Sequence, residues 1–90
     1  MFLDAYGVQQ ALAQYLRSQR EAVGLSRNAL AEKSLVPAST IKKFELTGQV
    51  SLRQFVLLWQ CLDELVHLNN LTQPAPKMPT SIEEVLSDDF

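Results

Sequence analysis

The segment between Pro37 and Gly48 places polar and small side chains at helical spacing. Positions three and four apart on a helix share a side, so one set is predicted to face outward together: Ala38, Ser39, Lys42 and Lys43. Lysine can donate to guanine O6 or N7, serine can pair with a base edge, and an alanine methyl can touch thymine. Lys43 is the first choice for reading a guanine, and Lys42 could do so or hold a phosphate. The competing interpretation is that the lysine pair is ordinary solvated surface.

A second set of residues is suited to contact the phosphates of DNA: Arg27, Asn28, Thr40 and Arg53. Arg27 and Asn28 begin one predicted helix and Arg53 lies near the start of another, where the helix N-terminus adds a partial positive charge. Thr40 offers a hydroxyl. Contacts of this kind set the position of a protein on DNA, whereas base contacts specify the sequence.

Two short helices must position these residues, at roughly 26–34 and 37–46. Ser26 can cap the first, and Pro37 can occupy the first turn of the second. A small residue, Ala31, lies where the helices must cross, which lets their backbones approach closely. The apolar residues are predicted to be buried: Leu30, Val36, Ile41 and Phe44. This spacing is typical of a helix-turn-helix, whose second helix enters the major groove of DNA.

Further amphipathic helices flank this pair. An amphipathic helix that ends at Gly24 is predicted from residues that recur at three- and four-residue spacing, all but Gln19 of them apolar or small: Val8, Ala11, Leu12, Tyr15, Leu16, Gln19, Ala22 and Val23. Ser51 can cap a fourth helix with one apolar stripe, Leu52, Phe55, Leu58 and Leu62. Leu65, Leu68 and Leu71 indicate a short fifth helix.

The fourth helix carries a second apolar stripe, of Val56 and Trp59, which Val66 can continue. One small core does not need so much apolar circumference. These three residues are therefore predicted to form a dimer interface. Because a good base contact contributes only about 1–3 kcal/mol, a single chain would read DNA weakly. A homodimer on a pseudo-palindromic operator doubles the contacts.

Composition favours one folded domain with a tail. The 90 residues are 47% apolar and 20% charged, which favours a folded domain over a disordered chain. The helical spacings described above predict an all-α, compact bundle of about five helices over residues 1–72. Residues 73–90 read as a proline-rich linker, with Pro74, Pro76 and Pro79, and a short amphipathic tail. The longest apolar run, 55–59, is far too short to span a membrane, and no leader pattern opens the sequence. We expect a soluble, cytoplasmic protein.

The net charge of −2 conceals a division along the chain. Residues 1–62 have a net charge of +3, and residues 63–90 one of −5. A basic body is compatible with DNA, and an acidic tail with a basic partner. Ser81 and Glu84 form a capping-box pattern in this tail. Its apolar side chains need a surface to bind, on the chain itself, a sister subunit or another protein: Ile82, Val85, Leu86 and Phe90.

The side-chain inventory argues against an enzyme. His67 is the only histidine, Cys61 lies in an apolar helical pattern, and the glycines form no phosphate-binding loop. The acidic pairs 83–84 and 88–89 lie on the tail, where no pocket would raise the pKa of a carboxyl group. We therefore expect no catalysis, no metal and no cofactor.

Residues 16–62 resemble the lambda-repressor/Cro-like helix-turn-helix family, also called the XRE family. The more specific matches are Leu16-Arg17 through Gly24-Leu25-Ser26, Thr40-Ile41 followed by Phe44-Glu45, and residues 47–52, TGQVSL. The chain length, the Phe-Glu pair, the Thr-Gly turn and the proline linker look most like HipB-type antitoxins. That resemblance implies autoregulation of an operon and pairing with a HipA-like kinase toxin.

Four positions depart from the family pattern. Leu35 stands where the family usually has a glycine in left-handed conformation, at a cost on the order of 1 kcal/mol. Arg27 stands where glutamine often contacts a phosphate. Ala38 and Ser39 stand where many relatives have long amides or arginines.

Taken together, the residues and the resemblance predict a dimeric double-stranded-DNA-binding repressor of the antitoxin type. The alternatives are a protein-interaction module of the same fold that does not read DNA, and a stand-alone or phage-type repressor.

Overall fold

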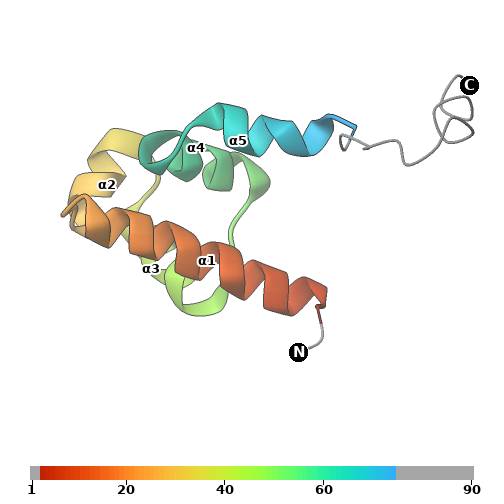
Figure 1. The fold of residues 1–90 in the computed structure, drawn as a ribbon. Coiled ribbons are helices and arrows are strands. Elements are labelled where there is room, and N and C mark those ends of the chain that lie inside the picture. The colour runs from red at the N-terminus through yellow and green to blue at the C-terminus, as the bar shows by residue number, and fades with distance from the viewer. Residues whose placement is uncertain (1–2, 75–90) are drawn as a thin grey trace, which may run out of the picture.

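The computed structural model describes residues 3–74, which form five α-helices and contain no β-strand (Figure 1). The helices are α1 (Ala5–Ala22), α2 (Arg27–Ser34), α3 (Ala38–Thr47), α4 (Leu52–Leu62) and α5 (Leu65–Asn69), followed by a 3₁₀ turn, η1 (Asn70–Thr72). The predicted all-α bundle of about five helices is confirmed. The proline-rich linker beyond residue 74 and the tail residues Ile82, Val85, Leu86 and Phe90 lie outside the described residues.

Short side chains begin three of the helices. Asp4 Oδ1 accepts the amide of Gly7 before α1, Ser26 Oγ that of Ala29 at α2, and Ser51 Oγ that of Gln54 at α4. Each bond satisfies an amide that has no partner within its helix. The two serine caps are confirmed. Pro37, expected within the first turn of α3, instead lies at the position just before it, where its carbonyl accepts the amides of Thr40 and Ile41.

The connection from α2 to α3 is a tight turn. Leu35 adopts the expected left-handed conformation, with φ 62° and ψ 20°, and its side chain is 84% exposed. The Ser34 hydroxyl accepts the amide of Val36 at 3.1 Å. The turn therefore buries Ser34 and Val36 on either side of a leucine that points into solvent.

Gly48 ends α3 and lets it approach α1. Its φ of 78° is left-handed, and a β-carbon there would lie 3.1 Å from the carbonyl carbon of Gln9. The Gln10 amide donates to the carbonyl of Thr47 at 2.7 Å across the same contact. Only glycine meets both requirements, so this residue sets how closely the end of α3 packs on α1.

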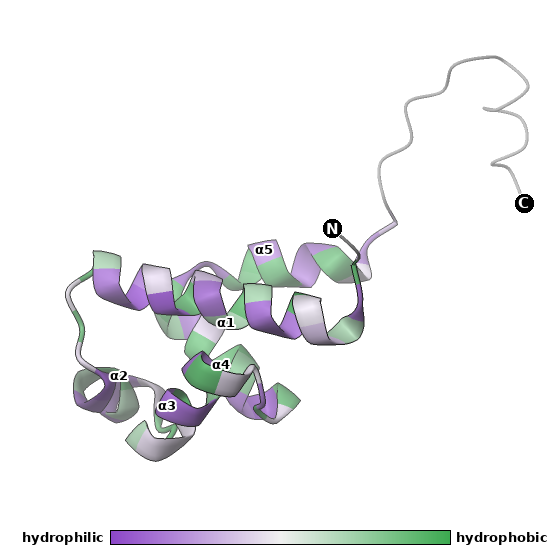
Figure 2. Cartoon of the chain, turned by 90° about the horizontal axis from the view of Figure 1, so that it is seen from below, coloured by the Kyte–Doolittle hydropathy of each residue, from purple (hydrophilic) through white to green (hydrophobic). Residues whose placement is uncertain are grey.

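The core lies between α1, α3 and α4, with α2 covering it at the C-terminal end of α1 (Figure 1). All four residues predicted to be buried around the α2–α3 turn are in it: Leu30, Val36, Ile41 and Phe44. From α4 come Phe55, Leu58, Trp59 and Leu62, and the rings of Phe44 and Phe55 meet edge-on at 5.9 Å. Figure 2 shows α4 largely in green, in keeping with its apolar circumference.

The buried face of α1 differs from the predicted one. Its buried residues are Ala13, Leu16 and Arg20, whereas Val8, Tyr15 and Val23 are 41–61% exposed. Leu52 of α4, expected in the core, is 78% exposed because it lies in the first turn of its helix, at the edge of the core.

A polar junction joins α1 to the link between α4 and α5. Asp63 accepts from the Tyr15 hydroxyl, from the amide of Glu64 at 2.6 Å, and contacts His67 Nδ1 at 2.7 Å. The hydrogen bond from Tyr15 and then those from Glu64 and His67 lower the pKa of Asp63 to about 2. The same bond raises the pKa of Tyr15.

Of the helices within residues 3–74, none is long and apolar enough to cross a membrane.

Candidate nucleic-acid interface

Helix α3 has one buried and one exposed side. Ile41 and Phe44 are each at most 2% exposed and pack in the core. On the opposite side, Ser39, Lys42 and Lys43 are exposed, and Ala38 is half-buried at the start of the helix. The predicted base-reading residues thus share the solvent side of α3, although their contact with DNA stays a prediction. Such a side can supply lysine ammonium groups, a hydroxyl and a methyl to the floor of a groove.

A shallow hollow beside the N-terminus of α2 is rich in arginine. It has a volume of about 400 Å³, and its lining residues are Arg17, Arg20, Ser26, Arg27 and Asn28. The predicted phosphate contacts Arg27 and Asn28 are therefore brought together, with two more arginines from α1 beside them. Arg17 also pairs with Glu21 of the same helix at 3.6 Å. The remaining phosphate candidates lie elsewhere, Thr40 half-buried on α3 and Arg53 exposed in the first turn of α4.

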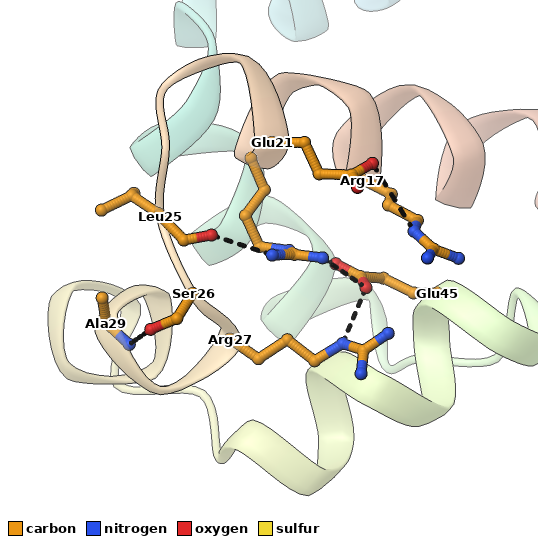
Figure 3. A network of polar contacts seen from close by, with 8 residues as sticks. Arg17, Glu21, Leu25, Ser26, Arg27, Ala29 and Glu45 are labelled. Carbon is orange, nitrogen blue, oxygen red and sulfur yellow. Dashed lines mark hydrogen bonds and ion pairs between the residues drawn. The ribbon is translucent and has the colours of Figure 1, made fainter.

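A buried carboxylate lies behind this hollow, where it holds two of the arginines (Figure 3). Glu45 of α3 accepts from Arg20 through both oxygens, at 2.7 Å from Nε and 3.0 Å from Nη2. Its Oε1 also accepts from Arg27 Nε at 2.9 Å. Arg20 Nη1 donates to the carbonyl of Leu25 at 2.8 Å. The network thus ties α1, the loop before α2, α2 and α3 together.

Within this network, Arg20 and Glu45 stabilise each other's ionised forms. Burial by itself favours the neutral form of Glu45, but the hydrogen bonds from Arg20 and Arg27 outweigh it, so the pKa of Glu45 is lowered. The hydrogen bond to Glu45 likewise raises the pKa of Arg20 against the effect of burial. No buried side-chain nitrogen or oxygen among the described residues lacks a partner. Both shifts favour the ionised forms of Arg20 and Glu45, and with Arg27 the cluster has a formal charge of +1.

Sequence reasoning did not identify Arg20 and Glu45 as a pair. Arg20 follows Leu16 by four residues and so continues the buried side of α1. An arginine in a buried register requires a carboxylate partner, and this was the available signal. Which of the chain's carboxylates would be that partner depends on how α1 and α3 cross. Arg27, expected to be a free phosphate ligand, also shares this partner.

The predicted dimer residues separate into two groups. Val56 is half-buried and Val66 is 54% exposed, and both line a groove of about 570 Å³ with Leu65, Leu68, Asn69 and Thr72. Trp59, in contrast, is 9% exposed within one chain. Its ring packs against Tyr15 and Phe55, and its Nε1 donates to the carbonyl of Glu64 at 2.9 Å. Trp59 is therefore a core residue, and the apolar surface that no other part of residues 3–74 covers is centred on Val56 and α5.

Comparisons with protein-family models, with curated proteins and with solved structures found nothing that matches this chain. The resemblance to the XRE family therefore stays a prediction from the residues.

Within residues 3–74, no cluster of three or more histidine, cysteine, aspartate or glutamate side chains is arranged to hold a metal ion. Cys61 is half-buried against the core, and His67 is exposed beside Asp63. The arginine-lined hollow and the outer side of α3 are the features that a functional proposal can use.

Proposed function

We propose that α2, the turn at Leu35 and α3 form a helix-turn-helix, and that the protein is a non-catalytic, sequence-specific repressor that binds double-stranded DNA. This proposal rests on the difference between the two sides of α3. Ile41 and Phe44 anchor one side of the helix in the core, while Ser39, Lys42 and Lys43 are exposed together on the other. A helix held in this way can enter the major groove with its donors toward the bases.

The arginine-lined hollow supports the same proposal. DNA presents closely spaced negative charges, and arginine pairs well with phosphate because its guanidinium is planar and permanently charged. Arg27 and Asn28 lie at the first turn of α2, where backbone amides and the helix dipole also favour an anion. A phosphate here would hold the domain on the backbone while α3 reads the bases.

We further propose that two copies bind a pseudo-palindromic operator, with half-sites about one helical turn, or 34 Å, apart. The groove around Val56 and Val66 supplies an apolar surface for the second copy. Following the resemblance to HipB-type antitoxins, the dimer would repress its own operon in the cytoplasm and pair with a HipA-like kinase toxin. The alternative, an interaction module that does not read DNA, is favoured by the same apolar groove.

The test is to select duplexes from a random library with the purified protein and to titrate the enriched duplex and a scrambled one by fluorescence anisotropy. We expect the double variant Lys42→Ala/Lys43→Ala to lose most of its preference for the enriched duplex, since each good base contact contributes about 1–3 kcal/mol of discrimination. Arg27→Ala should weaken binding to both duplexes equally and reduce the salt dependence by about one unit of slope per subunit.

A charge-matched control separates base reading from simple attraction. Lys33→Ala/Lys77→Ala removes the same charge from positions outside α3 and should leave the preference for the enriched duplex intact. If the library yields no enriched duplex, or if the two double variants behave alike, sequence-specific reading by α3 is wrong. Binding of a protein partner without any DNA binding would then favour the interaction module.

A further inference from the structure

Arg27 is held at one edge of its guanidinium only. Its Nε donates to Glu45 Oε1 at 2.9 Å, and no other hydrogen bond of this side chain is formed within the described residues. Figure 3 shows one terminal nitrogen of Arg27 pointing away from Glu45 and the other on the same side of the guanidinium as Nε. The side chain is 30% exposed and lines the hollow beside α2. Its free edge is the edge with which arginine forms bidentate pairs with phosphate.

The side chain of Glu45 is itself fixed by burial and by Arg20. Its side chain is 3% exposed, and Arg20 donates to both of its oxygens, at 2.7 Å and 3.0 Å. Arg20 is itself tied to the carbonyl of Leu25. The carboxylate therefore cannot follow Arg27 if that arginine moves, so Arg27 is held against a rigid support.

We propose that Glu45 is a positioning residue that holds the guanidinium of Arg27 so that its terminal nitrogens bind one phosphate of the DNA backbone. This inference rests on the proposed DNA-binding function and deepens it. Because Glu45 belongs to α3 and Arg27 to α2, the grip on the phosphate and the placement of the recognition helix are mechanically linked. A shift of α3 in its groove would move the arginine with it.

Simple electrostatics predicts the opposite effect of Glu45. A carboxylate near the DNA repels phosphates, so its removal should strengthen binding if charge alone mattered. Positioning predicts that its removal weakens binding at one particular phosphate, although the protein becomes more positive. The two views therefore predict opposite changes in DNA affinity when the Glu45 carboxylate is removed.

The experiment uses the enriched duplex with one phosphate at a time replaced by a neutral methylphosphonate. For the wild type, one position per half-site should lower affinity about tenfold or more, the effect expected for a charge-assisted hydrogen bond. Arg27→Ala should lose little further affinity at that same position, which identifies the phosphate that Arg27 contacts. This coupling between one side chain and one phosphate is a readout that a merely structural role would not produce.

Two variants then test the role of Glu45. Arg27→Lys keeps the charge and leaves the Arg20–Glu45 pair intact, but lacks the fork of the guanidinium. Glu45→Gln keeps the shape and removes the charge. For both variants, as for Arg27→Ala, we expect replacement of that phosphate by methylphosphonate to cause little further loss of affinity. Circular dichroism at the assay temperature confirms folding, and if Glu45→Gln is unfolded, Arg27→Lys decides the question.

Retention of the coupling by Arg27→Lys would show that charge alone acts there and would overturn the proposal. Retention by folded Glu45→Gln would do the same, and tighter binding of that variant to all duplexes would support the electrostatic view. These outcomes leave the proposed function standing. A wild-type protein that binds no duplex would instead overturn both the function and this inference.

Discussion

Leu35 is the one non-glycine residue with a positive φ among the described residues. An L-residue in this conformation is strained by roughly 1–2 kcal/mol, because its β-carbon crowds the following carbonyl oxygen. The side chain is 84% exposed and returns little burial energy. The turn keeps its shape because Leu30 and Val36 on either side of it are buried. The neighbouring core therefore offsets the strain at this single residue.

We expect Leu35→Gly to raise the free energy of unfolding by up to about 1 kcal/mol, since relief of the strain exceeds the extra entropy of glycine in the unfolded chain. Urea unfolding followed by circular dichroism measures this change. The control is Leu46→Gly, an exposed leucine within α3, which should lower stability because glycine is unfavourable in a helix. A loss of stability in both variants would mean that the Leu35 side chain makes contacts that matter.

At the scale of the elements, polar side chains of α1 join it to the rest of the bundle at several places, two of which involve a carboxylate. Arg20 reaches Glu45 of α3 near one end, and Tyr15 reaches Asp63 at the junction of α4 and α5. The second place is a set of hydrogen bonds on one carboxylate, which also contacts His67. Its bonds therefore fix both the end of α4 and the start of α5 relative to α1.

Acid should loosen this junction. The pKa of Asp63 is about 2 in the folded protein, against an ordinary value of 3.8, so the unfolded chain binds more protons between these pH values. The stabilisation is present above about pH 4 and is lost as the pH falls toward 2. We expect Asp63→Asn to be less stable than wild type at pH 7 and to lose less stability between pH 4 and pH 2, as measured by thermal unfolding.

Glu45, whose pKa is also lowered, remains in both proteins, so their difference reports Asp63 alone. Glu32→Gln serves as the control, because it changes an exposed carboxylate on α2 that makes no hydrogen bond or ion pair within the described residues. Parallel curves for Asp63→Asn and wild type below pH 4 would contradict the assigned role of the junction.

At the scale of the whole molecule, the apolar groove and the outer side of α3 belong to different surfaces. The groove is formed by Val56 of α4 with α5 and η1, whereas α3 packs on α1 and α2. Two copies could thus meet through the groove and leave both α3 helices free. This arrangement suits a dimer that reads two half-sites.

We expect the wild type to sediment as a dimer and Val66→Glu to weaken the dimer by about 100-fold or more, because an unpaired charge would be buried at its centre. Sedimentation velocity over a concentration series provides the measurement. Val23→Glu adds the same charge at the exposed end of α1, outside the groove, and should leave the dimer intact. Monomeric wild-type protein at high concentration, or equal effects of the two variants, would exclude this interface.

Much of the architecture could be predicted from local sequence. The helix caps at Ser26 and Ser51 and the burial of Ile41 and Phe44 follow from neighbours within about one helical turn, whereas the left-handed Leu35 was expected only from the family resemblance. Such features depend on helical periodicity and on hydrogen bonds to residues three or four positions away. For the same reason, the outward direction of Lys42 and Lys43 required no tertiary information.

The pairing of charges and the fate of the second apolar stripe were decided only by tertiary structure. Glu45 meets Arg20 and Arg27 across 25 and 18 positions of sequence, and Trp59 turns into the core against Tyr15 instead of remaining on the surface. These contacts depend on the angles and distances at which α1, α3 and α4 cross. Spacing along one helix tells which side a residue occupies, but not which residue of another helix it will meet.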